Sequence, residues 1–146
     1  MPEIFHIGDL EILARLVMAA ILCGMIGFER EYRHRPAGIR TNALVGMGTA
    51  LFTIASISFV QFGPEGSVDA ARVASYVLAG IGFIGAGTII QSRGIVKGLT
   101  TAASIWIVAA IGMVIGMGLY GPAIIATVLT MIVLVVLRNV HIEEEE

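Results

Sequence analysis

The stretch that decides the fold is residues 98–137, GLTTAASIWIVAAIGMVIGMGLYGPAIIATVLTMIVLVVL, a run of 40 residues without a charged side chain. As a single α-helix it would be about 60 Å long, twice the roughly 30 Å hydrocarbon core of a bilayer. Near its middle stands Gly118-Leu119-Tyr120-Gly121-Pro122, and glycine with proline ends one helix and begins the next. The stretch therefore predicts two membrane-spanning helices joined by a tight turn.

The rest of the chain has the same character. Of its 146 residues 57% are hydrophobic and 14% charged, with a mean hydropathy of +0.91, whereas soluble domains are about 25% charged. Residues 41–64 and 73–92 are also free of charge. This composition excludes a soluble enzyme, a secreted disulfide scaffold, a coiled coil and a nucleic-acid-binding domain as primary interpretations. We expect one all-α domain over residues 1–146, a polytopic membrane helix bundle with about five transmembrane helices at 10–28, 41–62, 72–91, 99–117 and 122–138.

The basic residues predict the orientation of this bundle. Seven of the nine fall on one side of the expected helices, and short loops rich in Lys and Arg stay in the cytoplasm. We therefore expect the N-terminus outside and the C-terminus in the cytoplasm, in agreement with an odd number of spans. The seven are Arg30, Arg33, Arg35, Arg40, Arg93, Lys97 and Arg138.

The first expected helix carries two charged residues, and the sequence leaves open whether they lie at the membrane surface or face the bundle. Glu11 and Arg15 are four residues apart and share a face. Arg15 is interpreted either as a snorkelling side chain paired with Glu11 at the outer interface or as a charge that faces the bundle. Glu29 follows 14 positions after Arg15, within about 40° on the helix and about 21 Å along it. One face would then carry a charge near each end.

The loop after this helix is dense in charge for its length. Topology and contact with anionic lipids account for its arginines, Arg30 and Arg40 among them. They do not account for Glu29 and Glu31 between the arginines, nor for the turn expected at residues 36–38. An ordered, ion-paired loop with a further role is the alternative, and it would extend to Thr41 and Asn42.

Small residues recur in two of the expected helices. Gly80, Gly82 and Gly85, with Gly87 two residues further on, contain a dinucleotide-binding pattern, Gly-x-Gly-x-x-Gly, but no strand precedes it and the context is an apolar helix. Close helix packing is the interpretation we favour, and an unwound segment that lines a polar site is the alternative. In the fourth helix the spacing GxxxG predicts a helix-pair or dimer contact, formed by Gly112 and Gly116.

The fourth helix begins with hydroxyl side chains at Thr100, Thr101 and Ser104. They are interpreted as capping and packing groups, or alternatively as a polar patch beside Lys97, Arg40 and Glu29 at the cytoplasmic surface. The three histidines are scattered, and no set of side chains has the spacing of a metal site or a nucleophilic triad. We expect no enzyme, no metal site and no cofactor.

Three segments together resemble the MgtC/SapB family of bacterial membrane proteins. They are GFERE at 27–31 running into PAGIRT at 36–41, GIGFIGAGTI at 80–89, and VKGLTTAASIW at 96–106 with AAIG at 109–112. The resemblance covers about residues 10–138. It implies an inner-membrane protein of about five spans with a cytoplasmic C-terminus, and we expect the transmembrane domain without the ACT-like domain that some members carry.

The resemblance also implies a function. The best-known members are factors of magnesium starvation and virulence that bind and restrain the F1Fo ATP synthase rather than move magnesium. Some members have Asn where this chain has Thr100.

Three hypotheses follow for this chain. The first is a non-enzymatic membrane regulator that acts by intramembrane protein contacts. The second is an ion or small-molecule transporter or channel, for magnesium among others, working as an oligomer. The third is a small-molecule-binding protein with a pocket formed by Glu29, Arg40, Lys97 and Thr100. In each case we expect a homodimer in the lipid bilayer.

Overall fold

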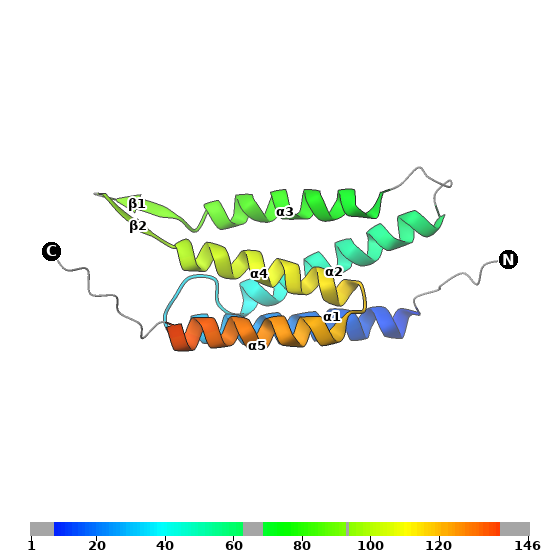
Figure 1. Cartoon of the computed structure of the whole chain (residues 1–146), viewed down its shortest axis with the longest axis horizontal. Coiled ribbons are helices and arrows are strands. Elements are labelled where there is room, and N and C mark those ends of the chain that lie inside the picture. Colours follow the sequence, from blue (N-terminus) through cyan, green and yellow to red (C-terminus); the bar gives the residue numbers. More distant parts are fainter. Residues whose placement is uncertain (1–7, 63–68, 93, 138–146) are drawn as a thin grey trace.

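The computed structural model describes residues 8–62, 69–92 and 94–137, which form five helices and one short β-hairpin (Figure 1). The all-α helix bundle predicted from the sequence is confirmed, and the hairpin is an addition to it. The elements in chain order are α1 (Asp9–Tyr32), α2 (Ile39–Phe62), α3 (Ala70–Ala86), β1 (Ile90–Ser92), β2 (Ile95–Lys97), α4 (Leu99–Gly116) and α5 (Tyr120–Val136).

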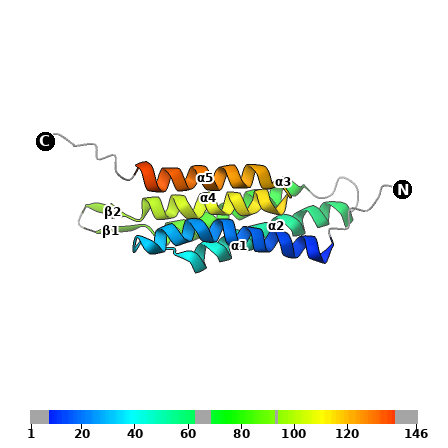
Figure 2. The ribbon, with the colours of Figure 1, turned by 90° about the horizontal axis from the view of Figure 1, so that it is seen from below.

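The helices lie side by side along the long axis of the molecule, which gives the bundle two distinct ends (Figures 1 and 2). The α1–α2 loop and the β-hairpin lie at one end, which we call the basic end (residues 29–40, 90–92 and 94–97). The α4–α5 turn and the start of α1 lie at the other, which we call the turn end (residues 9–15 and 116–120).

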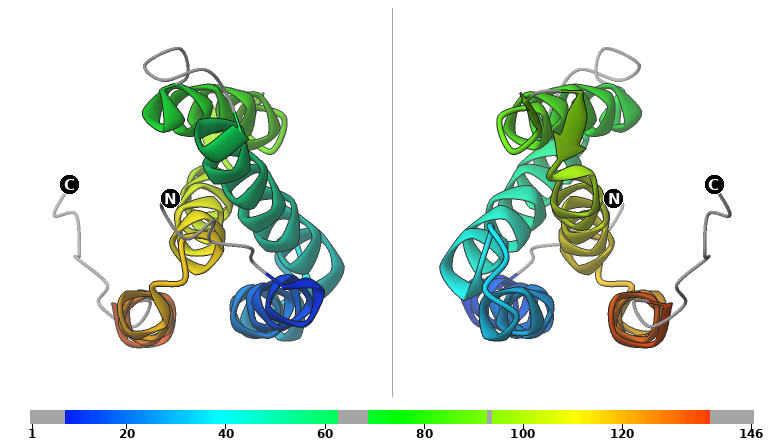
Figure 3. Two further views of the ribbon diagram at one scale, coloured as in Figure 1. Left: turned by 90° about the vertical axis from the view of Figure 1, so that its right-hand side faces the viewer. Right: turned by 90° about the vertical axis from the view of Figure 1, so that its left-hand side faces the viewer.

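The core lies where α1, α2 and α4 meet, and α4 runs through the middle of the bundle (Figure 3). In contrast, α3 packs mainly along α2 and α4, and α5 along α4 and α1, so each leaves much of its apolar surface outside. Such surface fits a bilayer, where hydrocarbon replaces water around the protein. The core side chains belong to Ala19, Cys23, Ile26, Ala50, Val108, Ile111, Ile115 and Ala123.

Glycines let the central helices approach closely. A Cβ at Gly27 would lie 2.7 Å from the Cα of Ile39, where α1 meets the start of α2. A Cβ at Gly116 would lie 2.6 Å from the carbonyl oxygen of Ala50, and Gly112 packs on α2 in the same way. The GxxxG pair of α4 is therefore a helix-pair contact within the chain, and it is not free to form the dimer contact considered above.

The hairpin was not predicted, and it shortens the third helix. α3 ends at Ala86, five residues before the expected end at 91, and Ile90–Ser92 is a strand that pairs antiparallel with Ile95–Lys97. At the end of α3 the hydroxyl of Thr88 donates to the Gly85 carbonyl at 2.7 Å. The β-branched residues that follow favour an extended chain, and Gly94 supplies the positive φ of the turn.

Within the described part of the chain, three helices are long and apolar enough to cross a membrane: Asp9–Tyr32, Ile39–Phe59 and Leu99–Gly116. The apolar helices Ser75–Ala86 and Tyr120–Val136 are shorter, and the 17 residues of the latter are at the lower limit of about 17–25 for a span. Arg93 and Arg138, which entered the prediction of orientation, lie outside the described residues.

Candidate functional site

Charged side chains gather inside the basic end of the bundle, at the last turns of α1. Glu29 and Arg30 are 6% and 7% exposed, which is rare for charged residues unless they are paired. Arg30 Nη2 donates a hydrogen bond of 3.0 Å to Oγ1 of Thr101, in the first turn of α4. The contact joins α1 to α4 through a buried cation and a hydroxyl.

Glu29 lies between two guanidinium groups. Its Oε2 is 4.0 Å from Nη1 of Arg30, and its Oε1 is 3.7 Å from Nε of Arg33, one turn further along α1. Within the described residues, Oε2 of Glu29 and the Nε atoms of both arginines are buried without a hydrogen-bond partner. We call Glu29, Arg30, Arg33 and Thr101 the basic-end cluster. It is ion-paired, yet it retains unused donors and an unused acceptor.

Glu29, Arg30 and Glu31, which the sequence placed in the loop, belong to the last turns of α1, and the shorter α1–α2 loop beside the cluster is held by side chains of the two helices that flank it. The carboxylate of Glu31 accepts a 2.9 Å hydrogen bond from the N–H of Ile39, the first residue of α2. Asn42 is fully buried, and its Nδ2 donates to the carbonyls of Ala37 and Gly38 at 2.5 and 2.9 Å. A carboxylate at a helix N-terminus also stabilises the helix dipole. This geometry favours the ordered, ion-paired loop over a purely topological one.

Four other polar residues proposed from the sequence are exposed. Arg40 and Thr41 are exposed at the start of α2. Lys97 is exposed on β2, and Thr100 is exposed at the start of α4. No hydrogen bond or ion pair among the described residues joins Glu29 to any of these four, so the pocket of the third hypothesis is not assembled in this structure.

At the turn end, Arg15 faces the bundle. Its side chain is buried, its Nη1 donates to the carbonyl oxygen of Gly116 at 2.6 Å, and its Nη2 pairs with the carboxylate of Glu11. The last carbonyls of a helix lack partners within it, and a cation there also interacts favourably with the helix dipole. Arg15 thus combines the two interpretations of the sequence, since it pairs with Glu11 and points inward.

An apolar layer separates Arg15 from the basic-end cluster. Along α1 the inward side chains between the two charges are Ala19, Cys23 and Ile26, none of them exposed. Val108, Ile111 and Ile115 of α4 are buried with them. The buried hydroxyls of Thr49 and Thr53 on α2 donate to carbonyls of their own helix at 2.8–3.1 Å. The two charges of α1 share a side of the helix without a polar line between them.

The hydroxyl side chains in the first turns of α4 lie partly in the core and partly at the surface. Thr101 lies in the basic-end cluster, and the hydroxyl of Ser104 donates to the Thr101 carbonyl at 2.7 Å. Thr100 and Ser104 both line a 450 Å³ groove between α4 and α5. The hydroxyls proposed from the sequence are therefore distributed over two places, and only Thr101 contacts a charge.

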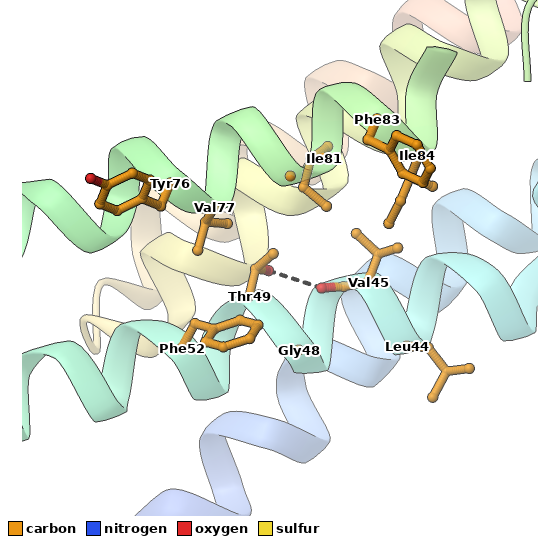
Figure 4. Close-up of a pocket in the computed structure, with 11 residues that line it drawn as sticks. Leu44, Val45, Gly48, Thr49, Phe52, Tyr76, Val77, Ile81, Phe83 and Ile84 are labelled. Carbon is orange, nitrogen blue, oxygen red and sulfur yellow. Dashed lines mark hydrogen bonds between the residues drawn. The ribbon is translucent and has the colours of Figure 1, made fainter. Parts of the chain in front are cut away.

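The four glycines at positions 80–87 also differ in their surroundings. Gly85 is buried, and a Cβ there would lie 3.6 Å from the Cβ of Ala102 on α4. Gly87 belongs to the turn after the helix. A Cβ at Gly80 or Gly82 would meet no atom within 4 Å. Among the described residues, neither of these two glycines therefore packs against another helix. Gly80 lines an apolar groove of 690 Å³ between α2 and α3 (Figure 4).

Sequence reasoning did not include Arg33 among the candidate residues. The signal was available, because Arg33 stands four residues after Glu29 and opposite charges at this spacing meet on a helix. Among the described residues no group of three or more His, Cys, Asp or Glu side chains is placed to hold a metal ion.

Apolar helices packed around an apolar centre, with the charges of the described residues near the two ends, define a membrane helix-bundle protein. The chain belongs to the MgtC family, whose sequence profile matches residues 16–142. The resemblance identified from the sequence motifs is thereby confirmed.

Pairwise comparison with individual proteins leads to the same family. The chain is 48% identical over 132 residues to YhiD of Escherichia coli K12, whose name presents it as a candidate magnesium transporter. It is 46% identical over 125 residues to MgtC of Brucella abortus and 39% identical over 127 residues to MgtC of Salmonella typhimurium. These alignments cover 88%, 86% and 87% of the chain but 61%, 50% and 52% of the relatives. No solved structure matches the chain.

Proposed function

We propose that this chain is a non-enzymatic regulator in the bacterial inner membrane that acts through contacts of its helices with another membrane complex and serves adaptation to magnesium limitation or related stress. The observation that carries the proposal is the apolar layer between Arg15 and the basic-end cluster. A magnesium ion that crossed it would find no oxygen ligand among the side chains of Ala19, Cys23 and Ile26, and an unpaired charge in such surroundings is costly. A sealed centre with extensive apolar surface outside it favours binding over transport.

The orientation is part of this proposal. Arg33, Arg35, Arg40 and Lys97 all lie at the basic end, and loops rich in such residues stay in the cytoplasm. We therefore assign the basic end to the cytoplasm in a multi-pass protein. The basic-end cluster would then lie at the cytoplasmic membrane surface, and Arg15 would lie at the outer membrane surface.

The partner is proposed to be a membrane complex such as the F1Fo ATP synthase, which the family resemblance implies. Relatives named MgtC support a shared role. A photo-reactive residue placed at Phe28, Phe83 or Leu129 would test it, because these side chains point outward from α1, α3 and α5 and are 58%, 84% and 56% exposed. The buried Ile111 is the matched control. We expect cross-links to a subunit of another complex from at least one exposed position and none from the control. Cross-links to this chain alone would contradict the regulator.

A homodimer is also proposed, and its support is the breadth of apolar surface on α3 and α5. Gly112 and Gly116 no longer favour it, because α2 occupies their face. The mass of the purified protein in mild detergent tests the proposal, and a monomer at all concentrations would refute it.

A transporter or channel is the second candidate, favoured by one observation. Oε2 of Glu29 is buried without a hydrogen-bond partner among the described residues, as expected of an acceptor that awaits a cation or a donor. Because the centre of the chain is closed, the route would lie between copies.

Vesicles with an entrapped magnesium dye separate the two candidates. The regulator predicts no uptake above that of empty vesicles. Saturable uptake that is abolished by Glu29→Gln and kept by Glu31→Gln, whose side chain lies outside the cluster, would establish transport and overturn the regulator.

A further inference from the structure

The β-hairpin is the part of the basic end that protrudes furthest. It continues the direction of α3 and extends beyond the ends of α4 and α5 (Figures 1 and 2). Its two strands pair with each other, and no helix among the described elements packs extensively against them. A two-stranded hairpin alone is at best marginally stable in water, so contact with a partner outside the described elements would stabilise it.

The register of the strands gives the hairpin two unlike faces. One face, which we call the isoleucine–lysine face, is formed by the cross-strand pairs Ile90–Lys97 and Ser92–Ile95. Gln91 and Val96 lie on the opposite face. Ile90 and Ile95 are 63% and 60% exposed, and Lys97 is exposed beside them. The isoleucine–lysine face thus combines apolar side chains with a cation.

The length of α3 places the hairpin at a bilayer surface. α3 begins on the side of the turn end (Figure 1), and Arg72 stands in its first turn, where a charge marks the limit of the hydrocarbon. From Arg72 to Ala86 the helix rises about 21 Å, which leaves about 9 Å of a hydrocarbon core of roughly 30 Å. About three extended residues cover that distance, so the opposite boundary lies close to Ile90.

The length of α4 leads to the same level. Its 18 residues rise about 27 Å from Gly116, whose carbonyl oxygen accepts the hydrogen bond from Arg15 at the turn end. About 3 Å of the core remain beyond Leu99, so the boundary lies close to Lys97. Ile90 and Lys97 are cross-strand partners. Two helices therefore place the hydrocarbon boundary independently at the base of the hairpin.

From this boundary outward, the hairpin lies in the headgroup layer. The layer is about 5–8 Å thick on each side of a bilayer, and a strand of three residues advances about 7 Å from its first residue to its third. Open strand edges do not occur in hydrocarbon, whereas headgroups and their water can bond the free backbone groups. At this depth isoleucine side chains contact the upper acyl chains, and the ammonium of a lysine reaches the phosphates.

The charges around the hairpin favour anionic headgroups. Between Asp69 and Glu143 the sequence contains no acidic residue. At the basic end, Glu29 is already paired with arginines of α1, and Glu31 accepts a hydrogen bond from the start of α2. Among the described residues no ion pair engages Lys97. An anion outside the chain would complement it.

We propose that the isoleucine–lysine face of the β-hairpin binds anionic phospholipid, with Ile90 and Ile95 at the boundary between acyl chains and headgroups and the ammonium of Lys97 on a phosphate. The hairpin then completes the span that α3 alone is too short to make. This role requires that the bundle crosses a bilayer, but it does not depend on whether the protein regulates or transports.

A fluorescent label on the hairpin, in a Cys23→Ser background, tests this face. Ser92→Cys carries the label on the isoleucine–lysine face, and Gln91→Cys, its neighbour on the opposite face, is the matched control. The vesicles contain phosphatidylcholine, a rising fraction of phosphatidylglycerol and a constant small fraction of phosphatidylcholine with a nitroxide quencher on its headgroup. Quenching should be roughly twofold stronger at position 92 than at position 91, because successive side chains of a strand point to opposite faces.

Three variants make the result specific. Ile95→Ser should abolish the difference between the two labels. In Lys97→Gln the phosphatidylglycerol fraction that gives half of the quenching at position 92 should rise about fivefold, the factor that one basic residue supplies near an anionic surface. Arg35→Gln, which removes an exposed arginine of the α1–α2 loop, should leave that fraction nearly unchanged.

Several outcomes would overturn the proposal. Equal quenching at both positions would do so, as would a dependence on phosphatidylglycerol that Lys97→Gln leaves unchanged. A label at position 92 that is shielded from both the nitroxide and aqueous acrylamide would show that protein covers this face. If the labelled variants do not fold, amide hydrogen exchange of the wild-type chain replaces them. Exchange in Ile90–Ser92 and Ile95–Lys97 should slow about fivefold when phosphatidylglycerol is added to phosphatidylcholine, and equal rates would refute the site.

Discussion

Replacing Gly112 by alanine adds one methyl group at the closest approach of α4 to α2. Its Cβ would lie 3.0 Å from the carbonyl carbon of Gly46 and closer still to the Gly46 oxygen and the hydroxyl of Thr49. These are mainly backbone atoms, and α2 cannot move away easily, because a Cβ at Gly46 would itself lie 2.7 Å from the Cβ of Cys23 on α1. The three helices are therefore in contact through their backbones, and the added methyl group must separate them.

The magnitude follows from two opposing terms. Overpacking a tight interface costs about 1–3 kcal/mol. Alanine in place of glycine in a helix recovers about 1 kcal/mol of that cost. Gly80→Ala is the matched control, since a Cβ there meets no atom within 4 Å and only the second term applies. We expect the free energy of unfolding to be about 1–3 kcal/mol lower for Gly112→Ala than for Gly80→Ala.

Denaturant titration in mixed micelles, followed by circular dichroism and by the fluorescence of Trp106, measures this difference. The two variants should unfold in clearly separated transitions, with Gly80→Ala at or above the wild-type midpoint. If Gly112→Ala unfolds together with Gly80→Ala, the backbone contact between α2 and α4 does not exist as described.

Three further substitutions test the polar contacts by the same titration. Thr101→Val removes the acceptor of buried Arg30 and should cost about 1–3 kcal/mol, whereas Thr100→Val, on an exposed side chain, should cost nothing measurable; equal effects would contradict the cluster. Arg15→Gln removes the charged donor to the end of α4 and should cost about 1.5–3 kcal/mol, and an unchanged midpoint would mean that Arg15 does not hold this carbonyl. Glu31→Ala removes the acceptor at the N-terminus of α2 and should cost about 1 kcal/mol, while a neutral result would indicate a loop ordered by other contacts.

The helices were predictable from the sequence because the bilayer imposes a simple rule on it. A run of apolar residues without charge must be helical when no water is present to bond the backbone. That rule did not predict the β-hairpin, because residues 87–92 continue the uncharged run without a proline. The available signal was Gly94 between two short β-branched segments, which is typical of a hairpin turn.

The site was less predictable than the fold, since it depends on how each helix is rotated. Helical spacing placed Arg15 and Glu29 on one face, but only packing decides whether that face is inward. Thr100 and Thr101 are neighbouring residues of the same type, so the sequence does not distinguish their roles. In the structure it is Thr101 that contacts Arg30. Likewise, GxxxG indicates close packing without naming the partner helix, which the structure shows to be α2.

The native cysteine gives the most direct test of the sealed centre. Cys23 is fully buried in the apolar layer, with its Sγ 3.6 Å from the carbonyl oxygen of Val108, and it is the chain's one cysteine. In vesicles, a membrane-impermeant thiol reagent applied on either side should leave Cys23 unmodified, while an Arg35→Cys, Cys23→Ser control should react rapidly from the side of the basic end. Modification of Cys23 at a rate close to that control would show water within the centre of the bundle, and it would contradict the apolar layer on which the proposed regulator rests.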